Sequence, residues 1–203
     1  YEGPAIILYS TSTAYLETGW RATQDEAGNL RARRREKNNQ KVDQPEEIQL
    51  ELFSNRFTGI AQEMGALLQR TAFSVNVKER LDFSCALLDA DGDLIVNAPH
   101  IPVHLGALGK CVKQVVKKLA LEEDDVAITN SPAYGGSHLP DVTLIAPIHF
   151  EGRLIGYAAN RAHHAEIGGI SPGSMPARAK NLAEEGVVIH PMKMVKKGDV
   201  QWG

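Results

Sequence analysis

The chain has 203 residues, 43% of them hydrophobic and 23% charged, and its formal net charge at pH 7 is −3. This length predicts one sizeable domain, or one domain with part of another, and the apolar fraction is sufficient for a hydrophobic core. The slight negative charge argues against a dedicated nucleic-acid or anionic-membrane surface, no apolar run approaches the roughly 18 residues of a membrane span, and no secretory pattern is present.

The two cysteines, Cys85 and Cys111, lie in apolar patterns (FSCALL and GKCVKQVV) without metal or redox spacing. They indicate buried thiols in a reducing compartment, so we expect a cytoplasmic protein. The sequence opens on YEGPAIILYS, without a methionine and directly on strand-like residues. We therefore expect the chain to be a fragment of a larger protein.

Residues 1–35 are expected to form a small β segment. Its strands are predicted at 4–9 and 13–17, followed by a hairpin whose turn lies at 26–29. The polar stretch REKNNQKVDQPEE comes next and shows no periodicity. Residues 36–46 are therefore predicted to be a linker.

Residues 47–203 are predicted to form a second domain that opens with a long helix beginning near Pro45. The proline and the two glutamates that follow it suit a helix N-terminus. Apolar residues recur at three- and four-residue steps, namely Phe53, Phe57, Ile60, Met64, Leu67 and Leu68. Such a stripe indicates packing into the core. A second amphipathic helix is expected at 107–120.

FSCALLDADGDLIVNA has the pattern of a hairpin with its turn at DADG. The triplet Asp89, Asp91 and Asp93 raises a calcium-loop alternative. It fails in detail, because such a loop has glycine at its sixth position and glutamate at its twelfth, where this chain has Leu94 and His100. We therefore interpret the acidic triplet as part of a turn.

LEEDDVAITNSPAYGG indicates a turn, a strand and a glycine loop. Strands and helices are thus mixed without a regular βαβ repeat, and no internal repeat is present. The expected fold class is α+β, with mixed strands and two amphipathic helices after the small β segment.

The last predicted hairpin joins the strand DVTLIAPIHF, which begins at Asp141, to the strand LIGYAANRAHH. A two-residue turn between them sets Asp141 opposite Ala162, whereas a four-residue loop sets it opposite His163. Opposed side chains stand about 4.5–5.5 Å apart at Cβ. Either register therefore brings Asp141 near the histidine pair at the end of the second strand.

His138 precedes Asp141 by three residues with Pro140 between them, so a bend can bring the two side chains together. Two imidazoles and a carboxylate suit Zn²⁺, Mn²⁺ or Fe²⁺. Because His163 and His164 alternate in direction, one of them is expected to be a ligand, and the register favours His163. His164 would then support the ligands or contact substrate. The alternative is that these histidines only brace the hairpin.

Other candidate sites are weaker. His100 and His104, in HIPVH, could join a polar pocket, although the intervening proline favours a turn. The loop GGISPGSMP could bind an anion through backbone N–H groups or simply turn the chain. GALGKC lacks the spacing of a phosphate-binding loop, and GGSHL is not a GxSxG elbow.

Four blocks resemble, in order and spacing, the hydantoinase B/oxoprolinase family: QRTAFSVNVKERLDFSCALLDADGDLI, APHIPVHLGAL, GGSHLPDVTLIAPI and NRAHHAEIGGISPGSMP. The resemblance covers residues 53–190, and the family's B half normally continues past Gly203. EGPAIILYSTSTAYLETGWRATQDEAGNL is similar to the end of the hydantoinase A half. A-like and B-like sequence on one chain resembles the fused ATP-dependent 5-oxoprolinases, while N-methylhydantoinases and acetone-type carboxylases share the B architecture.

The resemblance implies an enzyme of glutathione metabolism that opens 5-oxo-L-proline to L-glutamate while cleaving ATP. The A half, with ATP and Mg²⁺, would phosphorylate the lactam oxygen, and the B half would complete hydrolysis. Carboxylase members of the family hold a metal with an H-x-x-D pair and a later histidine, which match His138, Asp141 and His163 here. Mn²⁺ and Zn²⁺ are the first candidates.

His164 or His104 could move protons, and Arg161 or Arg80 could hold the substrate carboxylate, with a structural ion pair as the alternative for both arginines. The glycines of the loop at 168–169 (Gly168 and Gly169) are expected to contact substrate. The expected partners are a cyclic amide, the remaining parts of the A and B halves and further copies in an oligomer, with no nucleic acid or membrane. A non-catalytic assembly module remains the alternative of a different class.

Overall fold

The computed structural model describes residues 1–9, 12–34, 45–98 and 105–202. Contacts divide the chain into two units, Tyr1–Ile48 and Gln49–Gly203, which are described separately. Most of the predicted linker, together with His100 and His104, lies outside the described residues. Within the described residues, none of the helices combines the length and apolar character that a membrane crossing requires.

The first unit consists of two antiparallel hairpins. Strand β1 (Ala5–Leu8) pairs with β2 (Thr13–Leu16), and β3 (Trp20–Gln24) pairs with β4 (Leu30–Arg34). The β3–β4 turn is organised by Asp25, whose side chain accepts the N–H groups of residues 27 and 29. These contacts confirm the predicted strands and hairpin turn.

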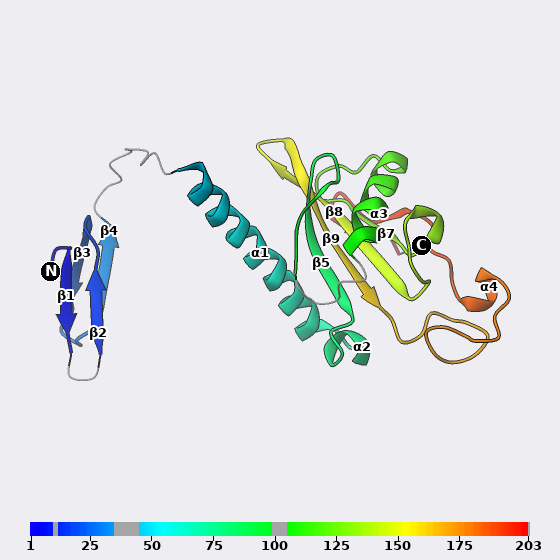
Figure 1. Ribbon diagram of the computed structural model, residues 1–203, viewed down its shortest axis with the longest axis horizontal. Helices are drawn as coiled ribbons and strands as arrows, with labels where there is room; N and C mark the ends of the chain where they lie inside the picture. The colour runs from blue at the N-terminus through cyan, green and yellow to red at the C-terminus, as the bar shows by residue number, and fades with distance from the viewer. Residues whose placement is uncertain (10–11, 35–44, 99–104, 203) are drawn as a thin grey trace. The chain divides into compact units, whose positions relative to one another are not determined.

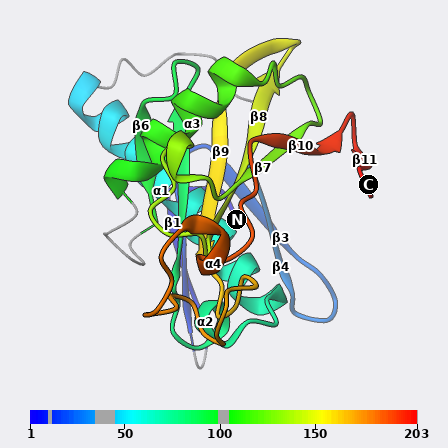
Figure 2. The same cartoon turned by 90° about the vertical axis from the view of Figure 1, so that its right-hand side faces the viewer.

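The second unit is built on a seven-stranded antiparallel sheet in the order β11-β10-β7-β8-β9-β5-β6. Figure 2 shows β9, β8, β7 and β10 in that order. The strands are β5 (Phe83–Asp89), β6 (Leu94–Asn97), β7 (Val126–Thr129), β8 (Asp141–Phe150), β9 (Arg153–His163), β10 (Met192–Lys196) and β11 (Asp199–Val200). The helical elements are α1 (Glu46–Thr71), α2 (Val75–Lys78), α3 (Leu105–Lys118), the 3₁₀ turn η2 (Pro132–Tyr134) and α4 (Leu182–Glu185). The predicted α+β class is confirmed.

Helices α1 and α3 pack against opposite faces of the sheet (Figure 1). The α3 face carries a buried cluster of Ala86, Leu88, Ile145, Tyr157 and Ala159 with Leu108, Cys111, Val112 and Val115 of the helix. The other face carries Phe83, Cys85 and Ala162 against Ala61 of α1. Because side chains alternate along a strand, Asp141 and His163 share the α3 face with Ile145 and Ala159. Both cysteines are free and buried, which confirms the predicted burial.

The prediction that the α1 stripe is core is wrong for much of its length. Phe53, Phe57, Ile60 and Leu67 are 51%, 37%, 45% and 55% exposed. The helix instead buries Ala61 and Gly65, with Met64 and Leu68 partly covered. These small side chains lie on the side of α1 that packs on the sheet, and the larger apolar residues point elsewhere on the helix circumference. A continuous apolar face of α1 is therefore accessible.

The β8–β9 hairpin combines features of both predicted registers. Glu151 and Gly152 have φ of 51° and 73° and form a two-residue turn, so Phe150 pairs with Arg153. Further along, residue 149 pairs with 154 but 148 pairs with 156, which leaves Ile155 as the extra residue of a β-bulge. The bulge shifts the register by one. Asp141 consequently lies opposite His163 rather than opposite residue 162.

Gly156, beside the bulge, lies where β9 approaches β5 closely. A Cβ atom at this position would stand 2.3 Å from the carbonyl oxygen of Leu88. Any other residue would therefore push the two strands apart.

The turn between β5 and β6 uses its carboxylates locally. Asp89 Oδ1 accepts the N–H groups of Asp91 and Asp93 at 3.0 and 2.8 Å. Asp93 also pairs with Lys113 of α3. These contacts agree with the interpretation of the acidic triplet as a turn.

Candidate metal centre

The first two residues of the candidate site come from a tight turn that leads into β8. The Asp141 N–H donates to the carbonyl of His138 at 3.0 Å, and the Val142 N–H donates to that of Pro140 at 3.0 Å. Two glycines make the preceding loop compact: Gly135 has a φ of 82°, and a Cβ on Gly136 would lie 2.5 Å from the carbonyl oxygen of residue 130. The sequence GGSHLPD therefore folds so that residues 138 and 141 face each other.

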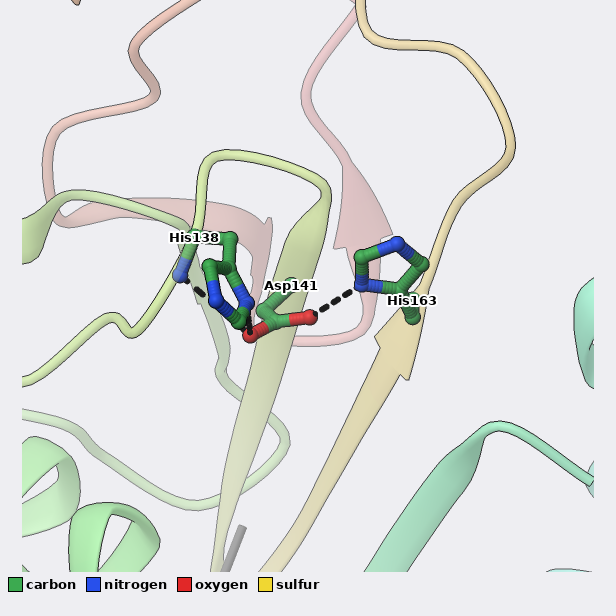
Figure 3. A group of neighbouring side chains, drawn as sticks. All are labelled: His138, Asp141 and His163. Carbon is green, nitrogen blue, oxygen red and sulfur yellow. Dashed lines mark hydrogen bonds and ion pairs between the residues drawn. The ribbon is translucent and has the colours of Figure 1, made fainter. Parts of the chain in front are cut away.

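His163 arrives from the neighbouring strand through the bulged register. Each carboxylate oxygen of Asp141 contacts one histidine. Oδ1 lies 2.7 Å from Nδ1 of His163, and Oδ2 lies 3.0 Å from Nδ1 of His138 (Figure 3). The His138 N–H also donates to Oδ2, at 3.3 Å. The side chain of Asp141 is fully buried, that of His163 is 12% exposed and that of His138 is 46% exposed. The site is thus closed at the carboxylate and open to solvent beside His138.

The three side chains fit a divalent metal ion. Each offers one ligand atom, and these atoms lie within 4.8 Å of one another; this is the one such group found among the described residues. Nitrogen and oxygen ligands about 2.0–2.2 Å from a metal stand roughly 3–3.5 Å apart. Small ring movements would therefore complete a three-ligand site. A mixed nitrogen and carboxylate set suits Mn²⁺, Zn²⁺ or Fe²⁺, and three protein ligands leave positions open.

His164 directly follows His163 and is fixed through its backbone. Its backbone N–H donates to the carbonyl of Pro140 at 2.9 Å, which ties the end of β9 to the turn. Burial, and then the neighbouring His163, lower the pKa of His164 below its usual value. The imidazole is therefore expected to be neutral at pH 7. Its role in moving protons stays a prediction.

Arg161 lies two residues before His163 on β9 and is completely buried. Its Nε donates to Thr143 Oγ1 at 2.8 Å, and Nη2 donates to the Gly135 carbonyl at 2.9 Å. Among the described residues, these partners are a hydroxyl and a carbonyl group rather than the carboxylate of an ion pair. Arg161 thus supports the loop at Gly135 and Gly136. Arg80, which follows α2, is exposed. Their proposed contact with substrate stays a prediction.

The glycine-rich loop at residues 166–176 binds a carboxylate from within the loop, that of Glu166. The carboxylate of Glu166 accepts the N–H groups of Ile167, Gly168 and Gly173 at 3.0–3.1 Å. These bonds, that of Gly173 first, lower the pKa of Glu166. Substrate would have to displace this carboxylate to reach the N–H of Gly168, so the prediction for Gly168 and Gly169 stays untested. Glu166 is not among the residues expected from the sequence, although a carboxylate directly before the IGG triplet is the signal for this contact.

Comparison with known proteins places the chain in a family. The family model "Hydantoinase B/oxoprolinase" matches residues 46–202, and the chain belongs to this family. The sequence is 48% identical over 205 residues to 5-oxoprolinase 1 of Arabidopsis thaliana, an alignment that covers 98% of this chain and 16% of that protein. The chain therefore spans about a sixth of this curated relative.

Two solved structures share the fold. An ATP-dependent caprolactamase from Pseudomonas jessenii matches with a TM-score of 0.68 and 30% identity, over 78% of this chain and 28% of that one. A nucleotide-free acetone carboxylase matches with a TM-score of 0.72 and 23% identity, over 77% of this chain and 21% of that one. The predicted α+β architecture agrees with both neighbours.

Proposed function

We propose that the chain is part of an ATP-dependent cyclic-amide hydrolase, with 5-oxoprolinase as the specific activity, and that it contributes a divalent metal centre to the hydrolytic step. The observation that carries the proposal is the convergence of His138, Asp141 and His163 at one end of the β8–β9 hairpin. Family membership and the relative named 5-oxoprolinase support the reaction class.

The overall reaction would convert 5-oxo-L-proline, ATP and two molecules of water to L-glutamate, ADP and phosphate. An unactivated lactam is a poor electrophile, so phosphorylation of its oxygen is the natural use of ATP. That step would belong to the A half, with ATP and Mg²⁺, of which residues 1–35 resemble only the end. The part described here would act on the activated substrate.

Mn²⁺ or Zn²⁺ is the proposed ion, with His138, Asp141 and His163 as its ligands. A divalent ion supplies Lewis acidity, which lowers the pKa of water and polarises a carbonyl group. The protein's contribution is orientation: buried Asp141 holds Nδ1 of both histidines within 2.7–3.0 Å. His164, neutral at pH 7, would accept a proton from the attacking water.

The remaining parts of the A and B halves, and further copies of the enzyme, are the proposed partners. The exposed apolar residues of α1 support an association surface. The proposed location of the enzyme is the cytoplasm.

Metal analysis tests the proposal. After removal of loosely bound ions, the purified chain and its Asp141→Ala, His138→Ala and His190→Ala variants are loaded with Mn²⁺ or Zn²⁺ and analysed for metal content. His190 is an exposed histidine and serves as the matched control. We expect about one ion per chain in the wild type and in His190→Ala, and none in the other two. Absence of stoichiometric metal from the wild type would favour the assembly-module alternative.

Activity then separates hydrolase from carboxylase. In a protein that also contains the A half, Asp141→Ala is expected to abolish glutamate release from 5-oxoproline and to leave ATP binding intact. A requirement for bicarbonate would instead indicate a carboxylase, and ring opening that survives the substitution would remove the catalytic role of the site.

A further inference from the structure

Asn130, which follows β7, is a polar residue with no exposed surface. Its Nδ2 donates to the carbonyl oxygens of Leu139 and Val187 at 2.8 and 2.9 Å, and its Oδ1 accepts the N–H of Ile189 at 2.6 Å. Both amide hydrogens are thus in use. The orientation of the amide is also determined, because a flipped side chain would set oxygen against two carbonyls and N–H against N–H.

One of these carbonyls lies in the middle of the turn that forms the metal site. Leu139 stands between His138 and Pro140 and is 1% exposed, so water does not reach it freely. The His138 carbonyl accepts the N–H of Asp141, and the Pro140 carbonyl accepts those of residues 142 and 164. Among the described residues, the donor to the Leu139 carbonyl is Asn130. A buried carbonyl that loses its donor is unfavourable, and this one can regain a donor only if the turn moves.

The same amide ties the turn to a second segment. Val187 and Ile189 lie between α4 and β10, almost 60 residues along the chain from Asn130. The backbone N–H of Asn130 also donates to the Ile189 carbonyl, at 3.2 Å. One side chain therefore holds both the turn at residues 138–141 and the segment at residues 187–189, which follows the loop at 166–173.

We propose that Asn130 is a positioning residue for the metal centre, which sets the separation of His138 and Asp141 and couples their turn to residues 187–189. The inference rests on the proposed function, because it assumes that these side chains bind a metal. It predicts that Asn130 affects metal affinity without contacting the ion.

The test is Asn130→Asp, with Thr129→Val as the matched control. The aspartate has the same shape but sets an oxygen where Nδ2 faced two carbonyls. Thr129 is equally buried, and its hydroxyl donates to the Ile189 carbonyl at 2.9 Å and accepts the N–H of Ser131. Within the described part of the chain, that hydroxyl makes no hydrogen bond to the turn at Leu139. Mn²⁺ affinity is measured from the electron paramagnetic resonance signal of the free ion, beside thermal unfolding of the metal-free chain.

We expect both variants to unfold at lower temperature, but only Asn130→Asp to bind Mn²⁺ about tenfold or more weakly, in the range typical of groups that orient metal ligands. A wild-type chain that binds neither Mn²⁺ nor Zn²⁺ would overturn the proposed function and this inference together. Wild-type affinity in Asn130→Asp, or an equal loss in both variants, would overturn the inference and leave the metal site standing.

A measurement on the wild type decides the case in which Asn130→Asp does not fold. Addition of Mn²⁺ is expected to slow amide hydrogen exchange in residues 131–141 and also in residues 187–190, because Asn130 holds both segments. Protection confined to residues 131–141 would contradict the coupling.

Discussion

Asp141→Asn is the sharpest perturbation of the site, because it keeps the shape of a buried side chain and removes its charge. In the metal-free chain, at least two charge-assisted bonds to histidine become neutral ones. Charged hydrogen bonds contribute about 1.5–3 kcal/mol and neutral ones about 0.5–1.5 kcal/mol. His138 is half exposed, so water replaces part of its bond. We therefore expect a loss of about 2 kcal/mol in the free energy of unfolding.

Metal enlarges this difference. A ligand that binds only the folded chain adds about 2.7 kcal/mol at a concentration 100 times its Kd. The wild type should gain this amount with Mn²⁺, and Asp141→Asn should gain almost none. The variant would then be about 5 kcal/mol less stable than the wild type in the presence of Mn²⁺.

The assay is urea unfolding with and without Mn²⁺, with Asp125→Asn as the control. Asp125 is also a fully buried carboxylate, but it binds Lys193 rather than a histidine. Asp125→Asn should lose stability and keep the gain from metal. If Asp141→Asn keeps that gain, or if the wild type gains stability from neither Mn²⁺ nor Zn²⁺, the assignment of Asp141 as a ligand is refuted.

Three further predictions concern features outside the metal ligands. Burial would raise the pKa of Asp125, but the bond from Lys193 and the N–H groups of residues 122 and 197 lower it to about 2. The ionised carboxylate therefore contributes about 2 kcal/mol to the free energy of unfolding above pH 4, and this contribution is lost as the pH falls to about 2. The stability difference between the wild type and Asp125→Asn, measured by unfolding at each pH, should vanish over that window. Replacing Phe53 and Phe57 together by glutamine should reduce concentration-dependent association in sedimentation velocity and change stability by less than about 1 kcal/mol, because the two residues are 51% and 37% exposed. Unchanged association would exclude this face of α1. Deletion of Ile155 removes the extra residue of the bulge and should leave Asp141 opposite His163, so metal content should be retained, and its loss would show that the bulge also shapes the site.

Local patterns were sufficient for the elements and for much of the site. Apolar spacing predicts the helix at Glu46–Thr71, and turn residues predict the β8–β9 strand pair. The bend between His138 and Asp141 follows from an H-x-x-D pair beside proline. These signals act over a few residues, so they can be interpreted without knowledge of the rest of the fold. The structure also shows His163 facing Asp141, as the strand register predicted, while its role as a metal ligand stays a prediction.

Long-range contacts were not visible in those patterns. Asn130 meets residues almost 60 positions away, and its sequence context, TNSP, indicates only a turn. The α1 stripe has the period of a buried helix, but periodicity does not say which part of a helix meets a sheet.

The amino-acid sequence alone determined which side chains could form the centre, since the order of histidine, proline and aspartate creates the bend and strand alternation turns His163 toward it. Tertiary structure decided the register that aligns them. The choice depends on a bulge at Ile155 beside a point where Gly156 lets β9 approach β5, a contact between strands some 70 residues apart. A one-residue slip reverses the face of every side chain in a strand, so the bulge, which the residue spacing of the hairpin did not predict, places His163 opposite Asp141.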